Sequence, residues 1–384
     1  MNRIHIAHII TGLSIGGAEK VLLRLVRDMN SDSFKNSVIS LTDLGPLGAQ
    51  LQDVGIPVSA MNFEKGVANL GPVSKLGREL RNSKPDLVQS WMYHADLIGG
   101  IAARLSTKAP VLWNLRQSTL DPQHSKRSTI RTANACAKLS PNIPNTIVCG
   151  SESARKVHTE MGYDFTKMVV LHNGFDTERY IPCHNLRSQF RRKLGIDDDT
   201  ILIGNPSRYD PQKDHKTFIE AATVVANRLP NSQFVLCGDQ ITSENTELMS
   251  AITASGLQDR THVLGVLDDI TSLYSAMDVL ALSSAYGEGA PNVLGEAMSA
   301  EVPCVATDVG DSAFIIGDTG TVVPPRNADA LAEALLKLAE LSPEQRHDLG
   351  SKARLRILQH FPLPTMVNRY EDLYRRVYSQ RYDF

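Results

Sequence analysis

The sequence predicts an α/β protein with two doubly wound domains, each a parallel β-sheet covered by helices. Short apolar segments alternate with longer segments whose apolar residues recur about every 3.6 positions, and this alternation is typical of parallel sheets. At 384 residues the chain is too long for a single ordinary core. A turn-rich stretch at 172–185 interrupts the alternation, which then begins again, so we place the domain boundary there.

The first domain, residues 1–175, begins with an apolar segment at 4–10 that predicts a buried strand. A glycine-rich turn follows, and then a helix whose apolar residues share one face between 18 and 29. The same two patterns predict the remaining elements of this domain. Strands are expected at 36–41, 85–91, 110–115 and 145–150, and helices near 72–83, 95–106, 126–139 and 151–161.

The second domain, residues 176–361, shows the same alternation. Strands are expected at 200–205, 233–238, 261–265, 278–283 and 303–307, and helices near 215–228, 243–255, 268–276, 291–300, 327–341 and 343–360. The last segment, 362–384, carries an apolar and aromatic stripe at helical spacing. We expect this C-terminal helix to pack back on the first domain.

Composition excludes several classes of protein. Hydrophobic residues make up 42% and charged residues 21%, as in a folded soluble protein, and the net charge of −2 argues against a dedicated nucleic-acid-binding protein. The five cysteines are scattered and never spaced C-x-x-C, so neither disulfides nor a zinc site is predicted. No segment approaches the roughly 20 apolar residues of a membrane span, and the N-terminal apolar run is too short for a signal peptide. We expect a cytoplasmic protein.

The most informative stretch follows the predicted strand at 278–283. Gly287 and Gly289 lie close together in a turn, and Pro291 precedes a run with helical spacing; proline is favoured at the first helical position because its missing N–H would be unpaired there. A strand, a glycine turn and a helix start direct backbone N–H groups and the positive end of a helix dipole to one place, which suits a phosphate. Two carboxylates, Glu288 and Glu296, accompany this turn, and we predict a sugar-nucleotide site.

Two cations follow the predicted strand at 200–205. Arg208 and Lys213 lie five positions apart in a turn, and such a pair can hold a diphosphate without a metal. The alternative is a pair of solvated surface charges. The run 197–199 has the D-x-D spacing of metal-dependent transferases, but its place between a glycine and a strand predicts a solvated turn. We therefore expect neither a metal nor a cofactor.

In these motifs and their order, the sequence resembles retaining glycosyltransferases of the GT-B fold, of the group 1 or family 4 type. The resemblance extends over essentially the whole chain. It implies two Rossmann-like domains that face each other across a cleft, with the acceptor in the first and a nucleoside-diphosphate sugar in the second. The motifs are GLSIGGAEKVLLRL (12–25), SWMYHADLIGGIAARL (90–105), NGFDTERY (173–180), SRYDPQKDH (207–215), EGAPNVLGE (288–296), PCVATDVGD (303–311) and GDTGTVVPP (317–325).

The resemblance implies roles for individual residues on the donor side. Arg208 and Lys213 correspond to the pair that binds the donor diphosphate. Glu288 corresponds to the carboxylate beside the donor sugar, and Glu296 to the residue that binds the ribose hydroxyls. The turn that faces the sugar and the phosphates corresponds to Gly289, Ala290, Pro291 and Asn292, and the segment that holds the base to Gly265, Val266 and Leu267.

On the acceptor side, His94 corresponds to a histidine near the reacting centre, whereas the residues alone also allow a buried structural histidine. Gly16 and Gly17 correspond to a flexible loop that meets the donor phosphate and the acceptor. The stretch 104–138 is basic, which indicates either a solvated face or a site for a lipid diphosphate with attraction to an anionic membrane surface. Its candidate residues are Arg116, Lys126, Arg127 and Arg131.

We expect a metal-independent transfer of a hexose-type sugar from a nucleoside-diphosphate sugar, with UDP rather than GDP. The acceptor is expected to be a surface glycan or its lipid carrier, reached from the inner face of the cytoplasmic membrane. Retention could use Glu288 as a nucleophile or proceed by same-face attack, and the resemblance favours the second. Two alternatives are a catalytically silent GT-B partner subunit and a sugar-nucleotide 2-epimerase. Glu301 and Asp311 depart from the pattern, which commonly has glycine at both positions.

Overall fold

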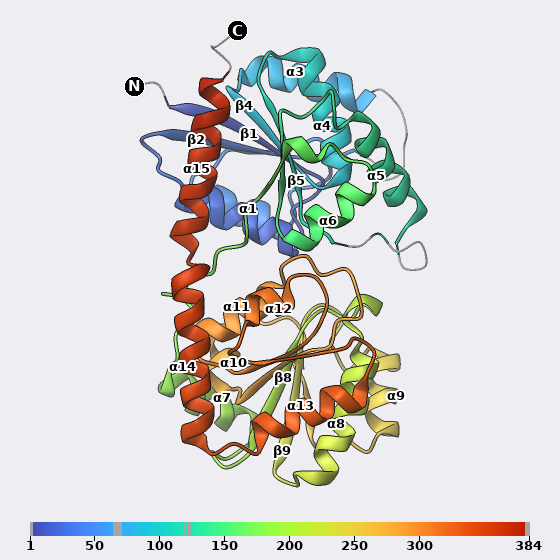
Figure 1. Ribbon diagram of the computed structural model, residues 1–384, viewed down its shortest axis with the longest axis vertical. Coiled ribbons are helices and arrows are strands. Elements are labelled where there is room, and N and C mark those ends of the chain that lie inside the picture. Colours follow the sequence, from blue (N-terminus) through green and yellow to red (C-terminus); the bar gives the residue numbers. More distant parts are fainter. Residues whose placement is uncertain (1–2, 64–70, 119, 121–124, 381–384) are drawn as a thin grey trace. The chain divides into compact units, whose positions relative to one another are not determined.

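The computed structural model describes residues 3–63, 71–118, 120 and 125–380. The chain forms two compact units. The first comprises Met1–Gly174 together with Leu363–Phe384, and the second comprises Phe175–Pro362. Each contains a parallel sheet and its own set of helices (Figure 1).

The sheet of the first unit has seven strands in the order β3-β2-β1-β4-β5-β6-β7. The strands are β1 (Ile4–Ile10), β2 (Phe34–Ser40), β3 (Val58–Ala60), β4 (Leu87–Trp91), β5 (Val111–Leu115), β6 (Thr146–Cys149) and β7 (Met168–Val170). The helices are α1 (Gly17–Asp28), α2 (Gly45–Asp53), α3 (Gly71–Ser83), α4 (Tyr93–Ser106), α5 (Arg127–Leu139), α6 (Glu152–Glu160) and α15 (Leu363–Ser379).

The sheet of the second unit has six strands in the order β10-β9-β8-β11-β12-β13. The strands are β8 (Ile201–Pro206), β9 (Ser232–Cys237), β10 (Thr261–Val263), β11 (Val279–Leu282), β12 (Cys304–Thr307) and β13 (Thr321–Val323). The helices are α7 (His184–Leu194), α8 (His215–Arg228), α9 (Thr246–Ala254), α10 (Thr271–Ala276), α11 (Asn292–Ser299), α12 (Ser312–Ile316), α13 (Ala328–Ala339) and α14 (Pro343–His360).

Both sheets are buried on their two faces, which is why their strands read as apolar runs. In β8, Ile201 and Ile203 join one hydrophobic cluster and Leu202 joins the other. Successive side chains of a strand point to opposite faces, so this alternation requires a core on each side of the sheet. The predicted doubly wound α/β architecture is therefore confirmed in each unit.

Helix α15 belongs to the first unit, where it packs against α1 and the sheet (Figure 1). Two of its tyrosines form hydrogen bonds with polar side chains of the strands. Tyr374 donates a hydrogen bond to Oε1 of Gln89 on β4 at 2.5 Å, and Tyr370 accepts one from Asn114 on β5 at 3.0 Å. The aromatic stripe of the last segment therefore both fills the core and pairs groups that would otherwise be buried alone.

The structure corrects two predicted helix starts. Pro291 precedes α11 as its N-cap residue and is not the first helical residue. Helix α4 begins at Tyr93, earlier than expected, because Met92 adopts a positive φ of 69° and turns the chain directly from β4 into the helix. His94 therefore lies in the first turn of α4 and not at the end of the strand.

Several elements carry too little local signal to be predicted. The strands β3, β7 and β13 have three residues each, and α12 has five. Helix α7 begins inside the turn-rich stretch and is rich in basic residues. None of the helices within the described ranges is long and apolar enough to cross a membrane.

Candidate functional site

Each sheet has a switch point, where neighbouring strands lead to connections that run in opposite directions. It lies between β1 and β4 in the first unit and between β8 and β11 in the second. Ligands of doubly wound sheets bind in the crevice beyond the carboxyl ends of such strands. The sequence motifs follow these four strands: Gly16 and His94 in the first unit, and Arg208, Lys213 and Glu288 in the second.

Lys213 and Glu288 form an ion pair beyond the ends of β8 and β11. Nζ of Lys213 donates to Oε1 of Glu288, and the side chains are only 13% and 8% exposed. Oγ of Ser284 donates to the same oxygen at 2.6 Å. The structure thus joins a cation and a carboxylate that lie 75 positions apart in the sequence.

Arg208 lies in the loop that carries Lys213, and its side chain is 47% exposed. Its guanidinium approaches Oδ2 of Asp210 at 3.4 Å and donates to Oε1 of Gln212 at 3.2 Å. Because these contacts are long and exposed, they leave the guanidinium able to reorient toward an anion. An exposed and a nearly buried cation therefore lie on one loop.

The turn between β11 and α11 is supported by the loop that follows β12. Gly310 has a φ of 64°, and a Cβ atom there would lie 2.2 Å from the carbonyl oxygen of Glu288. The backbone N–H of Asp311 donates to the carbonyl oxygen of Gly289 at 2.8 Å. Asp311 is one of the two residues that replace a glycine common in the family pattern. It is buried, and its backbone holds this turn. The N-cap residue Pro291 supplies no side-chain acceptor to the first turn of α11.

The other residue that replaces a glycine of the family pattern is Glu301. It follows α11 and has a φ of 61°. This left-handed conformation favours glycine, which accounts for the glycine that the family pattern has at this position.

Glu296 lies on α11 and is buried, with 2% of its surface exposed. One of its carboxylate oxygens accepts a hydrogen bond from the hydroxyl of Tyr274 at 3.0 Å. Burial raises the pKa of Tyr274 well above its ordinary value, so this hydroxyl keeps its proton and donates. The carboxylate predicted to bind ribose is therefore held in one orientation by α10.

The segment predicted to hold the base follows β10. Gly265 has a φ of 68°, and its carbonyl oxygen accepts from the N–H of Gly238 at 2.8 Å. Val266 is exposed, and both Val266 and Leu267 line a pocket of about 530 Å³ between this loop and α7. Gly265 to Leu267 thus lie after an edge strand of the same sheet.

In the first unit, Gly16 is the N-cap residue of α1 and Gly17 its first residue. A Cβ atom at Gly16 would lie 2.3 Å from Oε2 of Glu19, so the side chain of Glu19 occupies that space. His94 is half-buried, and burial lowers its pKa. His94 is therefore neutral near pH 7, the form that can accept a proton.

The predicted basic residues do not form one group. Lys126, Arg127 and Arg131 are exposed at the N-cap and along α5. The guanidinium of Arg116 instead donates to Oδ1 of Asn114 at 2.8 Å and to Oδ1 of Asn173 at 2.5 Å. It also donates to the hydroxyl of Tyr370 on α15 and lies over the ring of Trp91, 5.4 Å from its centroid. Arg116 is thus a structural residue of the first unit and not part of an exposed basic surface.

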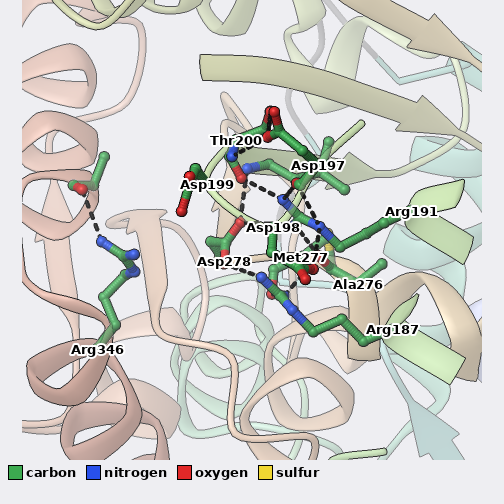
Figure 2. Close-up of polar contacts among 12 residues, drawn as sticks. Arg187, Arg191, Asp197, Asp198, Asp199, Thr200, Ala276, Met277, Asp278 and Arg346 are labelled. Atoms are coloured by element: carbon green, nitrogen blue, oxygen red, sulfur yellow. Dashed lines mark hydrogen bonds and ion pairs between the residues drawn. The ribbon is translucent and has the colours of Figure 1, made fainter. Parts of the chain in front are cut away.

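The run 197–199 forms a turn at the opposite edge of the second sheet. Oδ1 of Asp197 accepts from the N–H of Thr200 at 2.9 Å and from its hydroxyl at 2.6 Å. Beside this turn, Arg187 and the buried Arg191 contact Asp278 at 2.8 and 3.1 Å (Figure 2). Sequence reasoning missed this cluster, which anchors α7 at the amino ends of β8 and β11.

Both halves of the chain match known protein families. Residues 187–356 match the family described as Glycosyl transferases group 1. Residues 15–179 match Glycosyltransferase Family 4. The two matches together leave unmatched only the ends of the chain and a few residues between them.

Among full-length relatives is the UDP-Gal:alpha-D-GlcNAc-diphosphoundecaprenol alpha-1,3-galactosyltransferase of Escherichia coli. It is 24% identical over 97% of this chain and 97% of its own length. A putative glycosyltransferase of Bacillus subtilis, EpsF, is 24% identical over 79% of each chain.

Solved structures with a similar fold include HepE of Anabaena in complex with UDP-glucose. Its TM-score is 0.85 at 24% identity, over 97% of this chain and 100% of that one. The sucrose-phosphate synthase of Thermosynechococcus elongatus has a TM-score of 0.76 at 18% identity, over 98% and 100% of the two chains.

Proposed function

Because the chain belongs to the group 1 glycosyltransferases and has the GT-B fold, we propose that it transfers a hexose-type sugar from a UDP-sugar to a sugar hydroxyl. The observation that carries this proposal is the ion pair of Lys213 and Glu288 at the switch point of the second sheet. It brings a cation suited to a diphosphate next to a carboxylate suited to sugar hydroxyls. The name of the Escherichia coli relative and the complex of HepE support a UDP-sugar as the donor.

Cleavage of the sugar–phosphate bond leaves a nucleoside diphosphate with growing negative charge. Arg208 and Lys213, together with the first turn of α11, would stabilise that charge and make a metal unnecessary. A lysine ammonium has three N–H donors, and Glu288 needs only one of them. The ammonium can therefore bind a phosphate oxygen while the carboxylate keeps its orientation toward the sugar.

For the stereochemical course we propose retention by same-face attack. Oε1 of Glu288 already accepts from Lys213 and Ser284, and a carboxylate stabilised in this way is a weaker nucleophile. Glu288 then orients the donor sugar, and Glu296 binds the ribose hydroxyls. We assign the neutral His94 to the reacting centre and Gly16 and Gly17 to the loop that meets donor and acceptor.

For the acceptor we propose a glycan carried on a lipid diphosphate, as in the assembly of surface polysaccharides. The Escherichia coli relative is named for such an acceptor. The exposed cations Lys126, Arg127 and Arg131 would attract an anionic membrane surface, so we propose peripheral association with the inner face of the cytoplasmic membrane.

A donor assay over a panel of nucleotide sugars tests the proposed reaction. We expect turnover of one UDP-hexose in the presence of a lipid-linked acceptor, with the same rate after addition of a chelator and with the anomeric configuration retained. Tight donor binding without turnover would identify a silent subunit. Interconversion of the free donor sugar would identify an epimerase.

A further inference from the structure

A chain of buried hydrogen bonds surrounds the turn that carries Lys213. Oγ of Ser283, just beyond β11, donates to the carbonyl oxygen of Lys213 at 2.8 Å. Nδ2 of Asn205 on β8 donates to the same Oγ at 3.0 Å. Oγ of Ser207 donates to Oδ1 of Asn205 at 2.7 Å and lies 3.1 Å from Nε2 of His215. Because His215 lies two residues after Lys213, these contacts close into a polar ring.

The direction of each hydrogen bond in the polar ring follows from which atoms carry a proton that they can donate. A hydroxyl has one proton, and the protons of Ser283 and Ser207 are already donated to oxygen atoms. Nε2 of His215 must therefore carry a proton and donate it to Ser207. Nδ1 of His215 is then unprotonated, and no described residue donates to it. This agrees with burial and the nearby charge of Lys213, which lower the pKa of His215 to about 4.

The backbone between Lys213 and His215 is strained. Asp214 has a φ of 48°, which is uncommon for a residue with a side chain, and it caps α8 by accepting from Thr217. Surrounding contacts must hold such a conformation in place. The polar ring does this from both sides, since it binds the carbonyl oxygen before Asp214 and the imidazole after it.

We propose that Asn205, Ser207, His215 and Ser283 are positioning residues for Lys213. They fix the turn from which the lysine side chain departs, and so hold its ammonium where the donor diphosphate binds. The polar ring is almost fully buried, so water does not compete for its bonds. This inference rests on the proposed function, because it assumes that Lys213 binds the diphosphate.

The test compares Ser283→Ala with a matched control, Ser232→Ala. Ser232 is also a buried serine of the second unit that accepts from a side-chain N–H, that of Arg260, and donates to a backbone carbonyl oxygen, that of Leu229. UDP binding is measured by titration calorimetry and the melting temperature by scanning calorimetry. We expect Ser283→Ala to weaken UDP binding about tenfold, as expected for the loss of one good hydrogen bond, and Ser232→Ala to change only the melting temperature. Equal UDP affinities of the two variants would overturn the proposal.

A second pair of variants covers the case in which Ser283→Ala does not fold. His215→Gln keeps an N–H donor near the position of Nε2, and His215→Leu removes it. We expect near-native UDP affinity for the first and affinity weakened about tenfold for the second. Equal affinity of the two variants would contradict a positioning role.

A double variant, Ser283→Ala with Lys213→Met, tests whether the serine change affects UDP affinity through Lys213. If the polar ring acts through Lys213, the serine change has no further effect on UDP affinity in that background. An unchanged tenfold effect there would overturn the proposal while leaving the donor site intact. If Lys213→Met by itself leaves UDP affinity unchanged, the assignment of Lys213 in the proposed function fails, and the positioning role fails with it.

Discussion

Lys213 and Glu288 are nearly buried, and each supplies the charge that the other requires. A charge removed from water is costly unless it is paired and hydrogen-bonded, and Ser284 adds the second bond to Glu288. The pair therefore keeps the ammonium in place in the absence of a ligand. This preorganisation is what an electrostatic catalyst needs, because no reorientation energy is spent when the leaving group develops its charge.

At this scale we predict that Lys213→Ala lowers kcat/KM for the UDP-sugar by about 100- to 1000-fold, the usual effect of losing one preorganised donor. It also leaves Glu288 without its counterion, so the melting temperature should fall. Lys216→Ala is the matched control, because Lys216 lies close by on α8 with a side chain that is 84% exposed. Steady-state kinetics of both variants provide the measurement, and equal activity would contradict the role of Lys213.

Buried histidines make the stability of the protein depend on pH. Burial lowers the pKa of His8, His158 and His215 to about 4, below the ordinary value of 6.5. The unfolded chain then binds more protons than the folded one below pH 6.5. The stabilisation is complete above that pH and is lost as the pH falls toward 4.

We predict a loss of about 2 kcal/mol of unfolding free energy per buried histidine between pH 7 and pH 5. Denaturant titrations at the two pH values measure it. His158→Gln removes one titrating group and should reduce the difference. A protein equally stable at both pH values would contradict the neutral, buried state of these rings.

Among the elements, α15 is joined to the first unit by its apolar face and also by Arg116. One guanidinium bonds to Asn114 on β5, to Asn173 near the end of the segment Met1–Gly174, and to Tyr370 on α15. Three segments far apart in the sequence thus share one cation. Because the guanidinium is planar with several fixed donors, lysine cannot replace it.

We predict that Arg116→Ala lowers the free energy of unfolding by about 1–3 kcal/mol, because three polar partners lose a hydrogen bond to a charged group. Arg127→Ala, at the exposed start of α5, should change it by less than about 0.5 kcal/mol. Chemical denaturation of both variants provides the comparison. Equal stability would show that Tyr370 and the two asparagines find other partners.

At the scale of the whole molecule, the net charge of −2 conceals an uneven distribution of charge. Lys126 at the N-cap of α5 and Arg127 and Arg131 within that helix are exposed. We predict that the protein binds vesicles containing acidic lipid at low salt and that binding falls as salt screens the attraction. Serine at all three positions should weaken binding by about 1 kcal/mol for each charge removed, as measured by vesicle sedimentation.

The control for this experiment removes three exposed cations of the second unit, Arg192, Lys216 and Lys337, by the same change to serine. Because net charge changes equally in both triple variants, a difference between them reports the location of the basic surface. Equal binding of the two variants, or no binding at low salt, would remove the proposed attraction to membranes.

Much of the fold could be read from local patterns. Parallel strands buried on both faces are apolar runs, and their helices carry apolar stripes, so the alternation along the chain predicts two doubly wound sheets. The candidate residues follow strand ends, and the carboxyl ends of parallel strands meet at one edge. What local patterns could not reveal are β3, β7 and β13, three-residue strands whose side chains are too few to form a pattern.

The sequence by itself determined the fold class and the chemical types of the candidate residues, because these depend on residues close together in the chain. Only the tertiary structure decided how those residues are paired. Lys213 meets Glu288, the polar ring sets the tautomer of His215, and Arg116 is committed to Asn173 and Tyr370 and not to an exposed surface. The contact of Lys213 with Glu288 and those of Arg116 with Asn173 and Tyr370 join segments that strand order and helix packing bring together, and no periodicity in the chain encodes that order.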